Sequence, residues 1–240
     1  MKFLKFGNSK RFIVFLHGWA ADKNSFLWVK DYIKNYTLLF LDFAGFGESR
    51  EPERPYSVFD YVQELKMFLD KFEIEKLILV GHSFGGRVAI KFSSIYQQDY
   101  FDFKLCLVDS AGIKPRRGCG YYVKIYKYKL LKKIAKSHKN IEKYIAKLGS
   151  DDYKNLSPIM KESFKLIVNE DLSCDAKSIK IPTIIVWGEN DKDTKLYMAR
   201  KLNKLIKYSD LFIIEGAGHF SFLDNPQEFL IILDTFIKKQ

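Results

Sequence analysis

Short apolar runs alternate with amphipathic stretches along most of the chain. The runs are rich in Val, Ile, Leu and Phe, and most are continuously apolar rather than alternating with polar residues. Continuous apolar runs are typical of strands in a parallel sheet, because helices cover both faces of such a sheet. Six runs have this character: Arg11–Leu16, Thr37–Leu41, Lys76–Val80, Phe103–Val108, Thr183–Trp187 and Asp210–Ile214.

The stretches between these runs have helical periodicity. In Val58–Phe72 the apolar residues recur every three or four positions, which places them on one face of a helix. Phe84–Tyr96, Thr194–Ile206 and Pro226–Ile237 have the same kind of spacing. Strands that alternate with helices favour right-handed β-α-β crossovers. The pattern therefore predicts an α/β fold with an open, doubly wound and mostly parallel sheet.

The alternation stops between residues 113 and 179. Apolar residues in this segment keep a helical spacing, and no strand-like run interrupts them. The segment is too short, and too apolar on one side, to fold as a separate domain. We therefore expect residues 1–112 and 180–240 to form the core, and residues 113–179 to form a helical lid over the strand ends.

The composition indicates a globular protein with a large core. The chain has 240 residues, of which 47% are hydrophobic and 16% aromatic, whereas a disordered chain contains far fewer apolar residues. Cys106, Cys119 and Cys174 have neither metal-ligand nor disulfide-framework spacing, which favours a reducing compartment. The first residues lack the apolar stretch of a signal peptide, and no run approaches the about 20 apolar residues of a membrane span. These features predict a soluble cytoplasmic protein.

A serine between glycines follows the third predicted strand. Ser83 lies in a G-x-S-x-G sequence at residues 81–85, between the strand that ends at Val80 and the helix that begins at Phe84. In this context the pattern predicts a sharp strand-to-helix turn, where only glycines avoid a clash with neighbouring backbone. Such a turn exposes the serine hydroxyl and presents a backbone N–H at a helix N-terminus. The motif predicts a nucleophilic serine, and a turn without a catalytic role is the alternative.

Two further residues complete a candidate catalytic triad. A serine hydroxyl needs a base to remove its proton, and the base needs a carboxylate to fix its tautomer. His219 follows the last predicted strand and Asp191 follows the strand before it. Both lie just past the carboxyl end of a strand, where open α/β sheets collect their functional residues. Glu189, Asp193 and Asp109 remain alternatives for the acid, because they also lie near strand ends.

The loop after the first predicted strand is a candidate for anion stabilisation. His17, Gly18 and Trp19 follow that strand, and we expect the backbone N–H groups of Trp19 and Phe84 to form an oxyanion hole. The alternative is a tight turn with a buried tryptophan. His17 and His82 are expected to bond backbone groups near the site rather than to carry protons.

These motifs resemble those of the α/β-hydrolase superfamily over nearly the whole chain. The order serine, aspartate, histidine is the one used by that fold. Residues 41–49 resemble its D-x-x-G-x-G-x-S loop, and residues 108–112 resemble the segment after its sixth strand. Residues 17–19 and 81–86 are similar to small carboxylesterases, including pimeloyl-ACP methyl ester esterases, and to meta-cleavage-product C–C hydrolases. Haloalkane dehalogenases and epoxide hydrolases differ, because they carry aspartate at the position that corresponds to Ser83.

The resemblance implies a serine hydrolase that cleaves a carboxylic ester. The reaction would proceed through an acyl-enzyme on Ser83, with His219 as base and Asp191 as the acid that orients it. The chemistry requires no metal or organic cofactor, and the expected substrate is a small-molecule ester. Two alternatives remain open: a C–C bond hydrolase of the meta-cleavage type, and a catalytically silent protein that binds a ligand in the same fold.

The acyl group is expected to lie between core and lid. Aromatic residues flank the catalytic residues in the sequence, and others in the lid are candidates for the opposite wall. Simple packing within the lid is the alternative for the tyrosines. The candidate pocket residues are Trp19, Phe84, Phe220, Tyr121, Tyr122 and Tyr126.

The excess positive charge is confined to the lid. Residues 113–147 contain 12 Lys/Arg and 1 acid, whereas the rest of the chain contains 28 of each sign, so this segment accounts for the net charge of +11. Three interpretations of this segment are open: a helical face exposed to solvent, a binding surface for an acidic carrier such as an acyl carrier protein, and a binding surface for an anionic membrane. No nucleic-acid-binding motif accompanies the charge, so a nucleic-acid partner is not expected. The candidate carrier-binding residues are Arg116, Arg117, Lys124 and Lys127.

Overall fold

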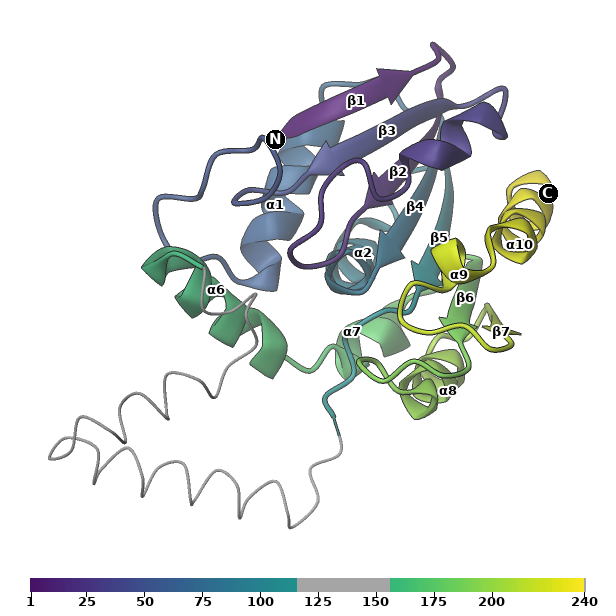
Figure 1. Ribbon diagram of the computed structural model, residues 1–240. Coiled ribbons are helices and arrows are strands. Elements are labelled where there is room, and N and C mark those ends of the chain that lie inside the picture. Colours follow the sequence, from purple (N-terminus) through teal and green to yellow (C-terminus); the bar gives the residue numbers. More distant parts are fainter. Residues whose placement is uncertain (116–155, 240) are drawn as a thin grey trace, which may run out of the picture.

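The computed structural model describes residues 1–115 and 156–239, whose strands form one seven-stranded sheet (Figure 1). The strand order is β1-β3-β2-β4-β5-β6-β7. β1 is antiparallel to β3, and all other neighbours are parallel. The predicted α/β fold with a doubly wound, mostly parallel sheet is confirmed. The strands are β1 (Lys2–Phe6), β2 (Arg11–Leu16), β3 (Thr37–Asp42), β4 (Lys76–His82), β5 (Asp102–Val108), β6 (Thr183–Gly188) and β7 (Ser209–Ile214).

Helices cover both faces of the sheet. α1, α2, α7 and α8 pack on one face, and α10 and the 3-10 helix η1 pack on the other (Figure 1). The described helices are η1 (Leu27–Asp31), α1 (Val58–Leu69), α2 (Phe84–Tyr96), α6 (Pro158–Asn169), α7 (Ser173–Ser178), α8 (Leu196–Leu205), α9 (Ser221–Asp224) and α10 (Pro226–Lys238).

The central strand β4 shows how the two faces are filled. Leu77 and Leu79 belong to the core cluster beneath α1 and α2, whereas Ile78 and Val80 belong to the cluster beneath α10. All four side chains are 0% exposed. Successive side chains of a strand point to opposite faces, so a strand covered on both faces must be apolar throughout. This explains why the sequence pattern was continuous rather than alternating.

Local hydrogen bonds define where the helices begin. At the start of α1, the Ser57 hydroxyl accepts the Asp60 N–H at 3.3 Å, and the Asp60 carboxylate accepts the Ser57 N–H at 2.7 Å. This reciprocal capping box satisfies N–H groups that the first helical turn leaves without partners. At the start of α10, the Asn225 side chain accepts the Glu228 N–H, and Pro226 occupies the first turn.

One strand and one helix end in the N-terminal part of the chain differ from the sequence-based expectation. Lys2–Phe6 was not assigned a strand, yet it pairs with β3 along its whole length. It is an edge strand whose residues are mostly exposed, so it carries little hydrophobic pattern. α1 ends at Leu69 rather than Phe72, because the Lys71 and Phe72 N–H groups bond to carbonyls three residues back and tighten the chain into a turn.

The loop after β3 is held by a buried ion pair. Asp42 is 0% exposed, and its carboxylate accepts the Lys23 ammonium at 2.8 Å, the Lys23 N–H at 2.7 Å and the Glu48 N–H at 2.9 Å. The Ser49 hydroxyl donates to the Asp42 carbonyl at 2.7 Å. The aspartate and serine of the D-x-x-G-x-G-x-S motif therefore close a loop, which carries Phe46 toward the Ser83 region.

Of the predicted lid, the structure describes residues 113–115 and 156–179. α6 packs on the core through Met160 and Ile167, which are each 2% exposed. The lid as a unit over residues 113–179 stays a prediction, because residues 116–155 lie outside the described part. No helix among the described residues is both long and apolar enough to cross a membrane.

Candidate active site

Ser83 stands at the turn between β4 and α2. Its backbone has φ 49° and ψ −109°, a left-handed φ that residues other than glycine rarely adopt. A Cβ on Gly85 would collide with the backbone carbonyl of Leu16, so the close approach requires glycine there. The Ser83 N–H donates to the Val108 carbonyl at 3.1 Å, and the Ala111 N–H donates to the Ser83 carbonyl at 3.0 Å. These bonds hold the strained residue in place.

His219 lies between Ser83 and Asp191. Its Nε2 is 3.0 Å from Ser83 Oγ, and its Nδ1 is 2.8 Å from Asp191 Oδ2. Because a carboxylate only accepts hydrogen bonds, Nδ1 carries the proton and the Nε2 lone pair faces the serine. The structure thus brings together the three residues that the sequence proposed as a triad, in the tautomer that a base requires.

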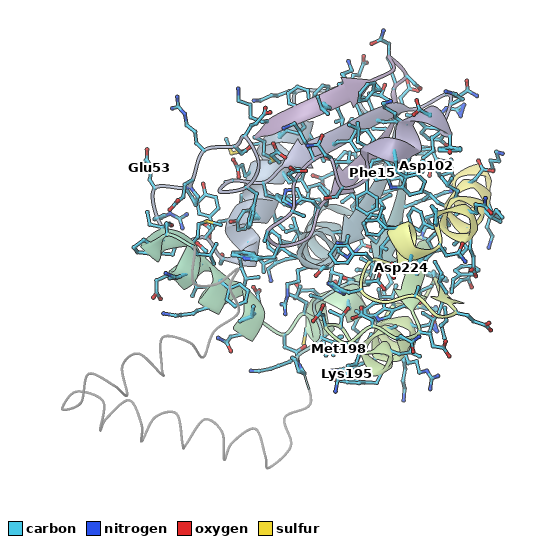
Figure 2. The ribbon with its side chains drawn as sticks, in the orientation of Figure 1. Phe15, Glu53, Asp102, Lys195, Met198 and Asp224 are labelled. Carbon is cyan, nitrogen blue, oxygen red and sulfur yellow. The ribbon has the colours of Figure 1, made fainter. Side chains whose placement is uncertain are left out.

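The loops that carry the histidine and the aspartate approach each other closely. A Cβ on Gly188, the last residue of β6, would collide with the Gly218 carbonyl oxygen, so only glycine fits. Asp224, the last residue of α9 and labelled in Figure 2, accepts the Gly218 N–H at 2.7 Å. This bond ties the histidine loop to the helical turn that follows it, and so restricts where the imidazole can lie.

The Asp191 carboxylate is held by the segment that follows it. Oδ1 accepts the Asp193 and Thr194 N–H groups at 2.8 and 2.9 Å, and Oδ2 accepts the Thr194 hydroxyl at 2.6 Å. Burial raises the pKa of Asp191, but its bonds with His219 and Thr194 outweigh burial and hold this pKa below the usual value. Asp191 is therefore ionised at neutral pH and can stabilise an imidazolium.

Asp109 has a different set of partners. Its Oδ1 accepts the Gly188 N–H at 2.8 Å, and its Oδ2 accepts the Ser221 N–H at 3.0 Å and the Ser221 hydroxyl at 2.6 Å. Burial raises the pKa of Asp109 to about 7, against the opposing effect of these bonds. Both oxygens are occupied by groups other than His219. Asp109 thus cross-links the end of β6 to the segment after the histidine.

The two other acids considered for the triad are exposed. Glu189 accepts the Gly216 N–H at 3.2 Å, and within the described residues neither it nor Asp193 bonds to His219. Ligand-type atoms of Asp191, Asp193 and His219 lie within 4.8 Å of one another. A metal ion bound there would have to replace the hydrogen bond that already joins Asp191 to His219.

The surroundings of His219 favour its charged form. Burial lowers the pKa of His219, but the hydrogen bond and charge of Asp191 outweigh burial and raise this pKa above 6.5. The neighbouring His82 has the opposite balance, because burial and then the charge of His219 lower its pKa to about 3. A neutral His82 donates through Nε2 to the His219 carbonyl at 2.8 Å.

His17 also bonds backbone groups. Its Nδ1 lies 2.7 Å from the Gly18 carbonyl and carries the proton, since its Nε2 accepts the Phe43 N–H at 3.1 Å. Burial lowers the pKa of His17 below its ordinary value. Neutral His17 and His82 thus brace the loops around Ser83, in agreement with the expectation from the sequence.

The segment that contains Trp19 and the residue Phe84 both adjoin Ser83. A Cβ on Gly18 would lie 3.4 Å from the Ser83 Cβ, which places the Trp19 segment beside the serine. The Phe84 N–H belongs to the first turn of α2, where N–H groups lack intrahelical partners. Among the described residues, neither the Trp19 N–H nor the Phe84 N–H donates to a backbone carbonyl. The oxyanion hole expected at these two amides stays a prediction.

Aromatic rings line the side of the site that faces α6. The Trp19 ring contacts Phe46, Phe84 and Phe164, with ring centroids 4.8, 5.3 and 5.1 Å apart. Phe46 and Phe164 are not among the pocket residues predicted from the sequence. Phe46 lies within the glycine-containing loop motif, which signals only a structural loop, and Phe164 belongs to an ordinary helical repeat. Only the packing of α6 on the core reveals them as neighbours of Trp19.

Another aromatic residue, Phe220, lies beside the imidazole. The ring centroids of His219 and Phe220 are 5.5 Å apart, and Phe220 is 47% exposed. The lid residues named from the sequence lie outside the described residues, so the structure does not place them. These are Tyr121, Tyr122, Tyr126, Arg116, Arg117, Lys124 and Lys127.

Comparison with known proteins settles the family. A model described as the alpha/beta hydrolase family matches residues 13–230. The chain belongs to the alpha/beta hydrolase family. This α/β hydrolase is 25% identical to the AB hydrolase superfamily protein YisY of Bacillus subtilis, over 93% of this chain and 90% of that protein. The resemblance inferred from the motifs is confirmed.

A further relative and a solved structure are each similar over nearly their whole length. The pimeloyl-[acyl-carrier protein] methyl ester esterase of Wigglesworthia glossinidia brevipalpis is 27% identical, over 95% of this chain and 93% of that enzyme. The solved structure of an esterase from Exiguobacterium antarcticum superposes with a TM-score of 0.76 at 21% identity, covering 99% of this chain and 95% of the other. At that identity, the superposition shows that the α/β hydrolase shares the fold.

Proposed function

We propose that this α/β hydrolase cleaves a carboxylic ester through an acyl-enzyme on Ser83. The observation that carries the proposal is the continuous chain of hydrogen bonds from Ser83 Oγ through His219 to Asp191, at 3.0 and 2.8 Å. A relative supports the class of substrate, since it is named as a methyl ester esterase. Such a chain activates a serine for acyl transfer, the class of reaction to which ester cleavage belongs.

In the first half of the reaction, Ser83 Oγ attacks the ester carbonyl while His219 Nε2 takes its proton. Asp191 stabilises the resulting imidazolium through its bond to Nδ1. The backbone N–H groups of Trp19 and Phe84 donate to the oxyanion, and a donor of this kind contributes about 3 kcal/mol. The imidazolium then protonates the leaving alcohol, and the acyl group stays on Ser83.

In the second half, water replaces the alcohol. His219, now neutral, takes a proton from water, and the resulting hydroxide equivalent attacks the acyl carbonyl. The same two amides hold the second oxyanion. When it collapses, Ser83 Oγ leaves and recovers its proton from His219, and the free acid departs.

A panel of esters that differ in acyl length and alcohol group tests this function. We expect turnover of at least part of the panel, together with covalent labelling of Ser83 by a fluorophosphonate probe, which reacts with activated serines. Faster cleavage of vinylogous diketone acids than of every ester would instead indicate a C–C hydrolase. If the probe does not label Ser83 and no ester is hydrolysed, the result would indicate a catalytically silent protein that binds a ligand.

The pH dependence of the reaction follows from the pKa of His219. Because Asp191 raises this pKa above 6.5, the midpoint of the acid limb of kcat/KM should lie above pH 6.5. Below that midpoint the imidazole is protonated and cannot accept the serine proton, so activity falls as pH falls. Hydrolysis of a neutral ester, whose own charge does not change with pH, measures the limb. A midpoint below 6.5 would contradict the proposed role of Asp191.

The proposal also covers the form of the substrate, which we expect to be attached to an acidic carrier protein. The support is the basic segment, residues 113–147. Its charge of +11 should act on encounter rather than on chemistry. Reversal of Arg116, Arg117, Lys124 and Lys127 to glutamate should lower kcat/KM for a carrier-bound ester substantially. The loss should shrink as salt rises, because a surface field is screened over roughly 8 Å at physiological ionic strength.

The matched control reverses four exposed lysines of the core, which changes the net charge equally. Hydrolysis of a small neutral ester by either variant should change little. Equal losses with both variants on the carrier-bound ester would assign the effect to net charge, and no loss would leave the basic segment as a solvated face. The control lysines are Lys34, Lys71, Lys204 and Lys207.

A further inference from the structure

Thr194 stands where three strand-end segments meet. It lies between β6 and α8, three positions after Asp191 in the sequence, and its exposed fraction is only 7%. Its carbonyl accepts the indole N–H of the fully buried Trp187 at 2.6 Å. Its hydroxyl lies 3.0 Å from the Asp109 carbonyl, at the end of β5. The residue is therefore held by a side chain of β6 and by the segment after β5.

The side chain and the backbone of Thr194 both bond to Asp191. The Thr194 N–H donates to Oδ1 at 2.9 Å, and the hydroxyl lies 2.6 Å from Oδ2. A hydroxyl has a single proton, and two acceptors compete for it: the Asp191 carboxylate and the Asp109 carbonyl. The carboxylate is charged and lies closer, so it receives the proton. The Thr194 oxygen also approaches His219 Nδ1, at 3.3 Å.

With this donor, every lone-pair direction of the Asp191 carboxylate is occupied. A carboxylate offers about four acceptor sites, two on each oxygen. Oδ1 receives the Asp193 and Thr194 N–H groups, and Oδ2 receives the Thr194 hydroxyl and His219 Nδ1–H. The two bonds on Oδ1 fix one end of the carboxylate. At Oδ2, the Thr194 hydroxyl and His219 Nδ1–H are the only donors among the described residues.

We propose that the Thr194 hydroxyl is a positioning group, which fixes the rotation of the Asp191 carboxylate so that Oδ2 points at His219 Nδ1. The inference rests on the proposed function, in which Asp191 orients the base. Without the hydroxyl, the carboxylate can pivot about the end held by the two amides. The imidazole then loses its alignment toward Ser83, although the substrate contacts are unchanged.

This role predicts a specific kinetic pattern for Thr194→Val, which keeps the shape of the side chain and removes the hydroxyl. We expect kcat to fall about 10- to 100-fold, the effect of a small misplacement of catalytic groups, while KM stays within about twofold. Thr194→Ser restores the hydroxyl and should recover most of kcat. A change confined to KM, or no recovery by serine, would overturn the proposal.

Thr183→Val is the matched control for the loss of a buried threonine hydroxyl. Thr183 is 2% exposed, and its hydroxyl donates to the Ile181 carbonyl at 3.0 Å. Thr183 is the first residue of β6, whereas Thr194 follows the end of that strand. In Figure 2, Asp102 marks the end of the sheet where β6 begins, and Lys195, the residue after Thr194, lies away from it. Thr183→Val should lower Tm and leave kcat unchanged. An equal loss of kcat in both valine variants would assign the effect to stability and overturn the proposal.

A spectroscopic measurement separates this inference from the proposed function. The His219 Nδ1–H that bonds to a carboxylate should give a proton resonance far downfield in the NMR spectrum of the intact protein. In Thr194→Val this resonance should shift upfield or broaden, and in Thr183→Val it should not move. If the parent protein hydrolyses no ester, the proposed function fails, yet the resonance still tests the positioning. An unchanged resonance in Thr194→Val would overturn the inference whatever the activity.

Discussion

Replacement of Ser83 by alanine should reduce ester hydrolysis on the order of 10⁶-fold, the size of effect seen when a serine nucleophile is removed from a comparable triad. The only hydrogen bond of the Ser83 hydroxyl within the described residues is the one to His219, so the variant loses the nucleophile and no structural bond. Initial rates on the best ester of the panel, with fluorophosphonate labelling, measure the loss.

Ser93→Ala provides the control on the same helix. Ser93 is fully buried, and its hydroxyl has no hydrogen-bond partner in the described part of the chain. This variant should keep the activity of the parent and its cooperative unfolding. Turnover by Ser83→Ala within tenfold of the parent would remove Ser83 from the mechanism.

Replacement of Asp191 by asparagine should lower kcat about 10⁴-fold, as in the comparable serine protease case. The two N–H groups on Oδ1 retain an acceptor, so the amide nitrogen is turned toward His219. An NH₂ group facing Nδ1 favours the tautomer that carries its proton on Nε2, and that tautomer cannot take the proton of Ser83. Steady-state kinetics on a neutral ester at the pH optimum measure the effect.

Asp193→Asn and Asp109→Asn test the rival assignments of the acid. The Asp193 side chain is exposed and only its backbone N–H bonds to Asp191, so kcat should stay close to that of the parent. In Asp109→Asn the three donors from Gly188 and Ser221 lose a carboxylate, so the free energy of unfolding should fall. A 10⁴-fold loss of kcat in Asp193→Asn with little loss in Asp191→Asn would show that the wrong acid was assigned.

The strands could be predicted because burial on both faces leaves a strong pattern. Leu77 to Val80 are apolar without interruption since each side chain meets a helix on its own side of the sheet. Lys2–Phe6 could not be assigned in this way. It pairs through backbone groups at the edge of the sheet, and exposed side chains place almost no restriction on sequence.

One helix boundary was wrong for a functional reason. The apolar spacing predicts a helix from Thr194, whereas α8 begins at Leu196. The Thr194 N–H and hydroxyl bond to Asp191, and its carbonyl bonds to Trp187, so its backbone groups serve the site rather than the helix. Such tertiary hydrogen bonds override local helical propensity, and the hydrophobic periodicity of the sequence does not reveal them.

The amino-acid sequence sufficed for the fold class and for Ser83, Asp191 and His219 as candidates, because each depends on short-range signals: periodicity, a glycine-flanked turn and position after a strand. Only the tertiary structure could choose among the acids, since Asp109, Asp193 and Asp191 all follow strands. The choice depends on which carboxylate points at the imidazole, and Asp191 Oδ2 does so at 2.8 Å. Side-chain direction results from packing between strands that are distant in sequence, so no local pattern encodes it.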